Sequence, residues 1–154
     1  MTTQQILLVK AEDVPDIWYS IKPLFEEALD HSTGEILPSD LLKALLNERE
    51  YLWIGVDEGK IKSALVVEPV KYPRKNVLRI LVWTVDKSSD FELWYKHLHL
   101  IEDFGIKLGC THLEAWARKG LVRKLKWDHE YSVISKPIKQ RQPRKRRRRP
   151  KKNG

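Results

Sequence analysis

A dense run of cations near the C-terminus, "PRKRRRRPKK" at residues 143–152, is the strongest chemical signal in the sequence. Its charged residues are Arg144, Lys145, Arg146, Arg147, Arg148, Arg149, Lys151 and Lys152. Cations packed this closely release many counterions from a polyphosphate, which gives salt-sensitive binding that is indifferent to base sequence. We therefore expect these residues to bind nucleic acid, in preference to an acidic protein or a membrane surface.

The other reactive side chains form no recognisable site. His97 and His99 stand two apart on an expected helix and face different directions, and His112 is distant in sequence, so we predict no metal site. Cys110 is the single cysteine, which excludes an intrachain disulfide and fits a reducing, intracellular setting. We expect it to be a small buried residue and not a nucleophile. The sequence has no phosphate-binding loop of the Walker type, no dinucleotide fingerprint and no hydrolase elbow.

The charge is divided unevenly between two parts of the chain. Residues 139–154 hold 10 of the 29 Lys and Arg residues and none of the 21 Asp and Glu residues, so residues 1–138 are close to neutral. The tail has no apolar side chain to anchor it, and we expect it to be disordered when free. Residues 1–138, in a chain that is 42% hydrophobic, are expected to form one domain. No stretch predicts an export signal or a membrane span.

The first half of the chain predicts one strand, two helices and an antiparallel meander. A strand at residues 6–9 leads into a helix that Asp13 can cap and that Pro23 should kink or split. Ser39 is the expected cap of a second helix. Strands then follow on either side of a turn at residues 57–60, and a third apolar run occupies residues 77–85.

The second half alternates helices and strands. Ser89 and Glu92 stand three apart as a capping box for a long helix that should end at Gly109. A strand at residues 111–117, a short basic helix at 119–127 and a strand at 130–138 complete the order β-α-α-β-β-β-α-β-α-β. This order predicts an α/β (α+β) class with a mixed, mostly antiparallel sheet flanked by helices.

The element order and two local stretches carry a family resemblance. Tyr72-Pro73-Arg74 leads into the central strand, and Arg118-Lys119-Gly120-Leu121 opens the last helix. With these features, residues 5 to 138 resemble the GNAT (GCN5-related N-acetyltransferase) fold family, in particular the GNAT-like proteins of tailed bacteriophages. The resemblance implies an acyl-CoA-dependent N-acetyltransferase domain at residues 1–138, with the basic tail at 139–154 outside it.

The resemblance also implies a site for acetyl-CoA after the central strand. The family meets the cofactor's pyrophosphate with a glycine-rich basic turn, because backbone N–H groups at a helix N-terminus bind anions. Here that turn is "DKSSDFE", residues 86–92, which contains no glycine and carries Asp86 and Asp90. The cofactor-binding residues would be Val85, Lys87, Ser88 and Ser89. Helix capping is the simpler explanation of the two serines.

Catalytic residues follow from the resemblance in the same way. Acetyl transfer to an amine needs a base near the central strands and an acid for the departing thiolate, a role that a Tyr often fills. Glu68 and Tyr131 are the nearest counterparts. Each also has a simpler explanation, since Glu68 precedes Pro69 at a strand end and Tyr131 lies in an expected strand, where an aromatic side chain usually packs.

Two functional classes are consistent with this sequence. The first is an acetyl-CoA-dependent N-acetyltransferase for a protein or small amine, with an altered phosphate loop and a tail that tethers it to nucleic acid. The second is a catalytically inactive GNAT-fold protein, working as a virion-associated or DNA- or RNA-binding accessory protein. The expected location is accordingly the cytoplasm of a host cell or a virion.

Overall fold

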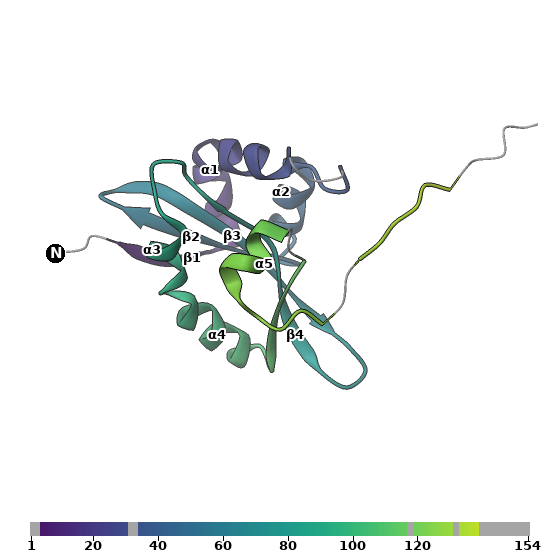
Figure 1. Ribbon diagram of the computed structural model, residues 1–154. Coiled ribbons are helices and arrows are strands. Elements are labelled where there is room, and N and C mark those ends of the chain that lie inside the picture. Colours follow the sequence, from purple (N-terminus) through teal and green to yellow (C-terminus); the bar gives the residue numbers. More distant parts are fainter. Residues whose placement is uncertain (1–3, 31–33, 117–118, 131–132, 139–154) are drawn as a thin grey trace, which may run out of the picture. The chain divides into compact units, whose positions relative to one another are not determined.

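The computed structural model describes residues 4–30, 34–116, 119–130 and 133–138. Figure 1 shows the elements, which are β1 (Gln5–Val9), a 3-10 turn η1 (Ala11–Asp13), α1 (Val14–Leu29), α2 (Pro38–Leu46), β2 (Tyr51–Asp57), β3 (Lys60–Lys71), β4 (Asn76–Val85), α3 (Phe91–Tyr95), α4 (Leu98–Lys107), β5 (His112–Ala115) and α5 (Lys119–Leu125). The chain divides into two units, Met1–Trp116 and Ala117–Gly154. No helix among the described residues is long and apolar enough to cross a membrane.

The first unit is built on one five-stranded sheet in the order β1-β2-β3-β4-β5. Strands β1 to β4 pair antiparallel, and β5 pairs parallel to β4, so the expected mixed and mostly antiparallel sheet is confirmed. The expected turn between β2 and β3 is also present. Glu58 and Gly59 both have positive φ angles, 51° and 77°, as a tight two-residue hairpin turn requires.

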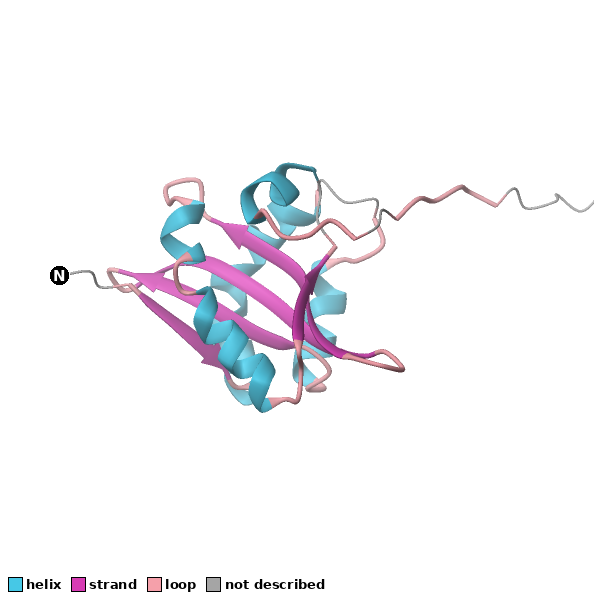
Figure 2. Ribbon diagram, turned by 60° about the horizontal axis from the view of Figure 1, so that its bottom comes forward, coloured by secondary structure: helices cyan, strands magenta, loops and turns pink. Residues whose placement is uncertain are grey.

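Helices cover both faces of this sheet (Figure 2). On one face, α1 and α2 bury the main hydrophobic core, in which Ile21 and Phe25 of α1 and Leu41 of α2 meet Leu52 and Val66 of the sheet. On the other face lie α3 and α4. Phe104 of α4 packs edge-on against Tyr51 and Trp53, with ring centroids 5.1 and 5.4 Å apart.

One glycine allows α3 to approach the sheet. Trp94 of α3 is buried, at 2% exposure, directly over Gly55 of β2. A Cβ atom on Gly55 would lie 2.6 Å from the Trp94 ring. This contact therefore requires a residue without a side chain at position 55.

The N-terminal helices begin and continue differently from the sequence-based expectation. Pro23 lies on the exposed face inside α1, which runs unbroken from Val14 to Leu29, so the helix is not split in two. Asp13 is the N-cap residue, but its side chain accepts no capping hydrogen bond. The cap of α2 is not Ser39 but Leu37, whose N–H donates to the Asp40 carboxylate at 2.9 Å.

The second half shows two further differences. The long helix expected to follow Ser89 is two helices, α3 and α4, separated at His97, where φ is −93° and ψ is 6°. Ser89 does not cap α3, whose N-cap residue is Asp90. The strand expected at residues 130–138 is not formed by the described residues 133–138, where Val133, Ile134 and Ile138 are exposed, because they pair with no neighbouring strand.

Candidate active site

Four charged side chains form a row across the sheet, which we call the charged row: Glu50, Glu68, Arg79 and Glu114. Strand pairing sets Arg79 of β4 between Glu68 of β3 and Glu114 of β5. Glu50 immediately precedes β2, whose first residue pairs with Val67, so Glu50 adjoins Glu68. The strand neighbours of the row pack against α4 on the opposite face, and the row therefore points to the face that carries α1 and α2.

Arg79 is the centre of the row. Its Nε donates to Glu114 at 2.8 Å, its Nη2 donates to the Tyr72 hydroxyl at 3.0 Å, and its Nη1 lies 3.5 Å from Glu68. The Tyr72 hydroxyl in turn donates to Glu114 at 2.9 Å. Burial acts to lower the pKa of Arg79, but the hydrogen bonds to Glu114 and Tyr72 outweigh it and raise the pKa above its usual value. The guanidinium also lies 4.2 Å from the centroid of the Trp116 ring.

Glu50 differs from the other carboxylates of the row. Its Oε1 atom is buried and has no hydrogen-bond partner among the described residues. Burial, followed by the negative charge of Glu68, raises the pKa of Glu50 to about 7, although Arg49 acts in the opposite direction. A carboxylate that titrates near neutral pH can both take up and release a proton under ordinary conditions. The sequence alone did not single out Glu50.

The row lies where β4 and β5 part. The parallel pairing covers only Val77–Ile80 of β4 and ends at Ala115 of β5. Residues 81–85 of β4 continue beyond that point and pair only with β3 among the described residues. An extended ligand that added a strand to this stretch would lie beside the charged row.

The loop expected to hold the cofactor joins β4 to α3. Val85 pairs with Ser63 at the end of β4, and the Lys87 ammonium lies 3.3 Å from the Glu27 carboxylate of α1. The Ser88 N–H and hydroxyl both donate to Asp86 Oδ1, at 2.9 and 2.6 Å. The binding role predicted for Val85, Lys87, Ser88 and Ser89 therefore meets a loop whose polar groups already have partners.

Ser89 contributes to the packing of α3. Its N–H donates to the Asp86 carbonyl at 2.9 Å, and its hydroxyl accepts a hydrogen bond from Trp94 Nε1 at 2.8 Å. The hydroxyl thus satisfies the one polar atom of a buried indole. This geometry explains Ser89 without a ligand.

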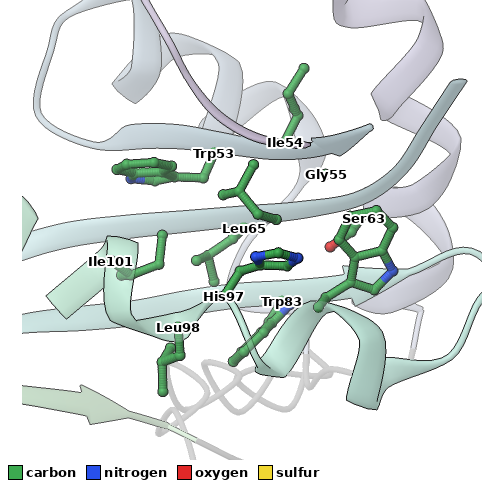
Figure 3. Close-up of a pocket in the computed structure, with 11 residues that line it drawn as sticks. Trp53, Ile54, Gly55, Ser63, Leu65, Trp83, His97, Leu98 and Ile101 are labelled. Carbon is green, nitrogen blue, oxygen red and sulfur yellow. The ribbon is translucent and has the colours of Figure 1, made fainter. Parts of the chain in front are cut away.

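A small cavity lies on the other face of the sheet, between β2, β3, β4 and the start of α4 (Figure 3). Its volume is about 20 Å³, which is enough for one water molecule and too small for an acetyl group with its carrier. Trp53 Nε1 and His97 Nε2 are buried without a partner among the described residues, and both side chains line the cavity. Burial, and then the charge of Lys96, lowers the pKa of His97. A cavity of this size does not hold the reacting groups of an acetyl transfer.

The remaining candidates divide into those the structure places and those it does not. Among the described residues, no group of three His, Cys, Asp or Glu side chains could hold a metal ion. Cys110 is buried, and burial raises the pKa of its thiol, which opposes a nucleophilic role. Tyr131 and the basic residues 144–149, 151 and 152 lie outside the described residues.

Solved structures of several acetyltransferases are similar to this chain. An aminoglycoside acetyltransferase from an uncultured soil metagenomic sample, meta-AAC0020, in complex with sisomicin, superposes with a TM-score of 0.66 at 20% identity, over 88% of this chain and 95% of that one. Ribosomal-protein-alanine N-acetyltransferase from Brucella melitensis biovar Abortus 2308 superposes with a TM-score of 0.67 at 10% identity, over 88% of this chain and 99% of that one. The chain has a GNAT-like fold.

A third structure with this GNAT-like fold contains CoA. Aminoglycoside N-acetyltransferase AAC(6')-Iy in complex with CoA superposes with a TM-score of 0.66 at 12% identity, over 90% of this chain and 97% of that one. No protein-family model matches the chain, and no curated protein matches its sequence. At identities this low the likeness concerns the fold, and the activity has to be argued from the site.

Proposed function

We propose that the protein is an acetyl-CoA-dependent N-acetyltransferase-like protein that acts on an amine beside the charged row. The observation that carries this proposal is the row itself, placed where β4 and β5 part. The row holds three carboxyl groups and one guanidinium, which contacts Glu68 and Glu114, and this excess of acidic groups favours a cationic acceptor over an anionic one. The GNAT-like fold supports the same reaction by analogy.

Glu50 is the best placed proton acceptor of the row. An amine is protonated near neutral pH, and it becomes a nucleophile only after it loses that proton. Glu50 has a free buried oxygen and a pKa of about 7, whereas Glu68 is paired with Arg79. We therefore prefer Glu50 to Glu68 as the base, directly or through a water. Tyr131 stays a prediction for the acid.

The fit of acetyl-CoA itself is uneven. When bound, acetyl-CoA supplies the acetyl group as a thioester, and the free edge of β4 offers backbone groups to its extended arm. The loop at residues 86–90 fits the diphosphate poorly, because its N–H donors at Ser88 and Ser89 are already occupied. This pairing supports our reading of the phosphate loop as degraded.

The decisive experiment is a titration of the full chain with acetyl-CoA, followed by thermal shift and calorimetry. We expect a saturable rise in melting temperature, because a ligand that binds only the folded state stabilises it by mass action. Binding should need millimolar acetyl-CoA, given the occupied loop. An unchanged melting temperature at millimolar acetyl-CoA, together with no heat of binding, would rule out the proposed activity.

The basic tail carries the second part of the proposal. We propose that residues 139–154 tether the domain to DNA or RNA, since ten of the chain's cations and no acidic residue lie there. A bacteriophage-type setting, in the host cell or in a virion, is supported by two local sequences that resemble phage GNAT-like proteins. These are Tyr72-Pro73-Arg74 and the basic stretch that begins at Arg118.

A catalytically inactive accessory protein is the alternative function. The observation that favours it is the internally paired loop at residues 86–90, which leaves little for a nucleotide cofactor to bind. Such a protein would act in a virion or on nucleic acid through its tail alone. The acetyl-CoA titration separates the two functions.

A further inference from the structure

The loop between β4 and α3 is held by hydrogen bonds among its own polar groups and to β3. Asp86 is the hub: its N–H donates to the Lys62 carbonyl of β3 at 2.7 Å, and its carbonyl accepts from the Ser89 N–H at 2.9 Å. Its side-chain Oδ1 accepts both the N–H and the hydroxyl of Ser88. Lys62 Nζ donates to that hydroxyl at 2.8 Å.

These donors are the ones that would otherwise meet an anion. A backbone N–H, a hydroxyl and an ammonium gathered on one loop form a typical anion-binding group. Here the Asp86 carboxylate already accepts from the N–H and the hydroxyl of Ser88, and the Lys62 ammonium donates to that same hydroxyl. An incoming phosphate would have to displace Asp86 and would also be repelled by its charge.

Asp86 carries that charge at neutral pH. Its pKa is lowered, first by the hydrogen bond from the Ser88 hydroxyl, then by the Ser88 N–H, with a smaller contribution from Lys62. Protonation of Asp86 is therefore not a route by which the loop would open near neutral pH. A substitution that removes the charge and keeps an oxygen acceptor tests the charge separately from the loop conformation.

We infer that Asp86 is a specificity-determining residue that acts as an internal anion and lowers the affinity that a diphosphate would otherwise add to an acyl donor. A donor that lacks the nucleotide, such as an acyl-pantetheine thioester, is not penalised in this way. The wild-type protein thus distinguishes little between the two donors, and the nucleotide adds little affinity. This inference rests on the proposed acyl-transfer function and concerns the donor side of the same site.

The test compares two donors on three full-length proteins. Dissociation constants of acetyl-CoA and acetyl-pantetheine are measured by calorimetry for wild type, Asp86→Asn and the matched control Asp90→Asn, which removes one exposed negative charge from the same loop. Asp86→Asn keeps Oδ1 as an acceptor for Ser88. Removing a unit charge within about 5 Å of a diphosphate should tighten acetyl-CoA about tenfold and leave acetyl-pantetheine unchanged.

Asp90→Asn should tighten the binding of acetyl-CoA by no more than about threefold, because it removes an exposed charge that solvent and salt already screen. Equal gains in both variants, or an equal gain for acetyl-pantetheine in Asp86→Asn, would overturn the inference and leave the acyl-transfer function standing. Unchanged acetyl-CoA affinity in Asp86→Asn would do the same. If neither donor binds to any of the three proteins, the proposed function fails and the inference fails with it.

Discussion

Glu50 shows how one side chain acquires its chemistry from its neighbours. It is an ordinary surface-type residue in the sequence, yet it lies half-buried beside the Glu68 carboxylate. Both burial and the like charge disfavour its ionised form, so the folded protein holds a proton on it up to about pH 7. The unfolded chain releases that proton near pH 4.5.

This difference in proton uptake predicts a pH-dependent stability. Between about pH 4.5 and 7 the folded state binds more protons than the unfolded state at Glu50, so the free energy of unfolding falls as pH rises through this window. Glu50→Gln removes the free-energy cost of ionising a carboxyl group at this half-buried position beside Glu68. Because the group is half-exposed, we expect the variant to gain on the order of 1–2 kcal/mol over wild type at pH 8.

Urea unfolding at pH 5 and pH 8 measures this prediction. The control is Glu102→Gln, on the exposed face of α4. It should change the free energy of unfolding only slightly, and by the same amount at pH 5 and pH 8. If the free energies of unfolding of wild type and Glu50→Gln differ by the same amount at pH 5 and pH 8, Glu50 does not hold the proton in the folded state.

At the scale of elements, the contact between α3 and β2 depends on one missing side chain. We predict that Gly55→Ala destabilises the protein by about 1–3 kcal/mol, because the new Cβ would lie 2.6 Å from the ring of the buried Trp94. Chemical denaturation measures the loss. Far smaller effects would mean that α3 can move away from the sheet without cost.

Gly105 of α4 is the matched control for this substitution. A Cβ there would lie 3.6 Å from the nearest atom, Leu78 Cδ2, which is an ordinary van der Waals distance. Since alanine is also the better helix former, Gly105→Ala should be neutral or should stabilise the protein by up to about 1 kcal/mol. A loss as large as that of Gly55→Ala would show that the two glycines act through general packing and not through the Trp94 contact.

For the whole molecule, the prediction concerns the division of charge. Deleting residues 139–154 removes ten cations and no acidic residue, and so changes the formal net charge from +8 to −2. We expect the truncated protein to lose salt-dependent binding to double-stranded DNA and RNA oligomers. If six or more phosphates are contacted, full-length affinity should fall by about 10³ or more between roughly 50 and 200 mM salt.

Fluorescence anisotropy of labelled oligomers at several salt concentrations measures this loss. The comparison variant keeps the tail and replaces Arg123 and Lys124 of α5 by Gln. Binding that survives truncation but disappears in the α5 variant would assign the nucleic-acid contact to α5 and contradict the tail proposal.

Local patterns in the sequence predicted most of the elements. The hairpin turn between β2 and β3, the strands on either side of it and the apolar faces of α1 and α2 follow from residue preferences and from periods of two and 3.6. The break at His97 and the identity of the helix caps were not predicted. The cap of α3 depends on tertiary packing, because the Ser89 hydroxyl accepts a hydrogen bond from Trp94 instead of capping the helix.

Composition and local periodicity were sufficient to predict the basic tail, the near-neutral body and the order of elements from β1 to β4. The charged row depends instead on the pairing of distant strands. Counted from the turn at Asp57 and Lys60 without interruption, Glu50 would face Val67, but an irregularity at Gly55/Val56 moves it next to Glu68. A second irregularity at Val66/Val67 brings Arg79, and not Ile80, opposite Glu68. A one-residue shift turns a side chain to the other face of a sheet, so the two bulges place these charges together.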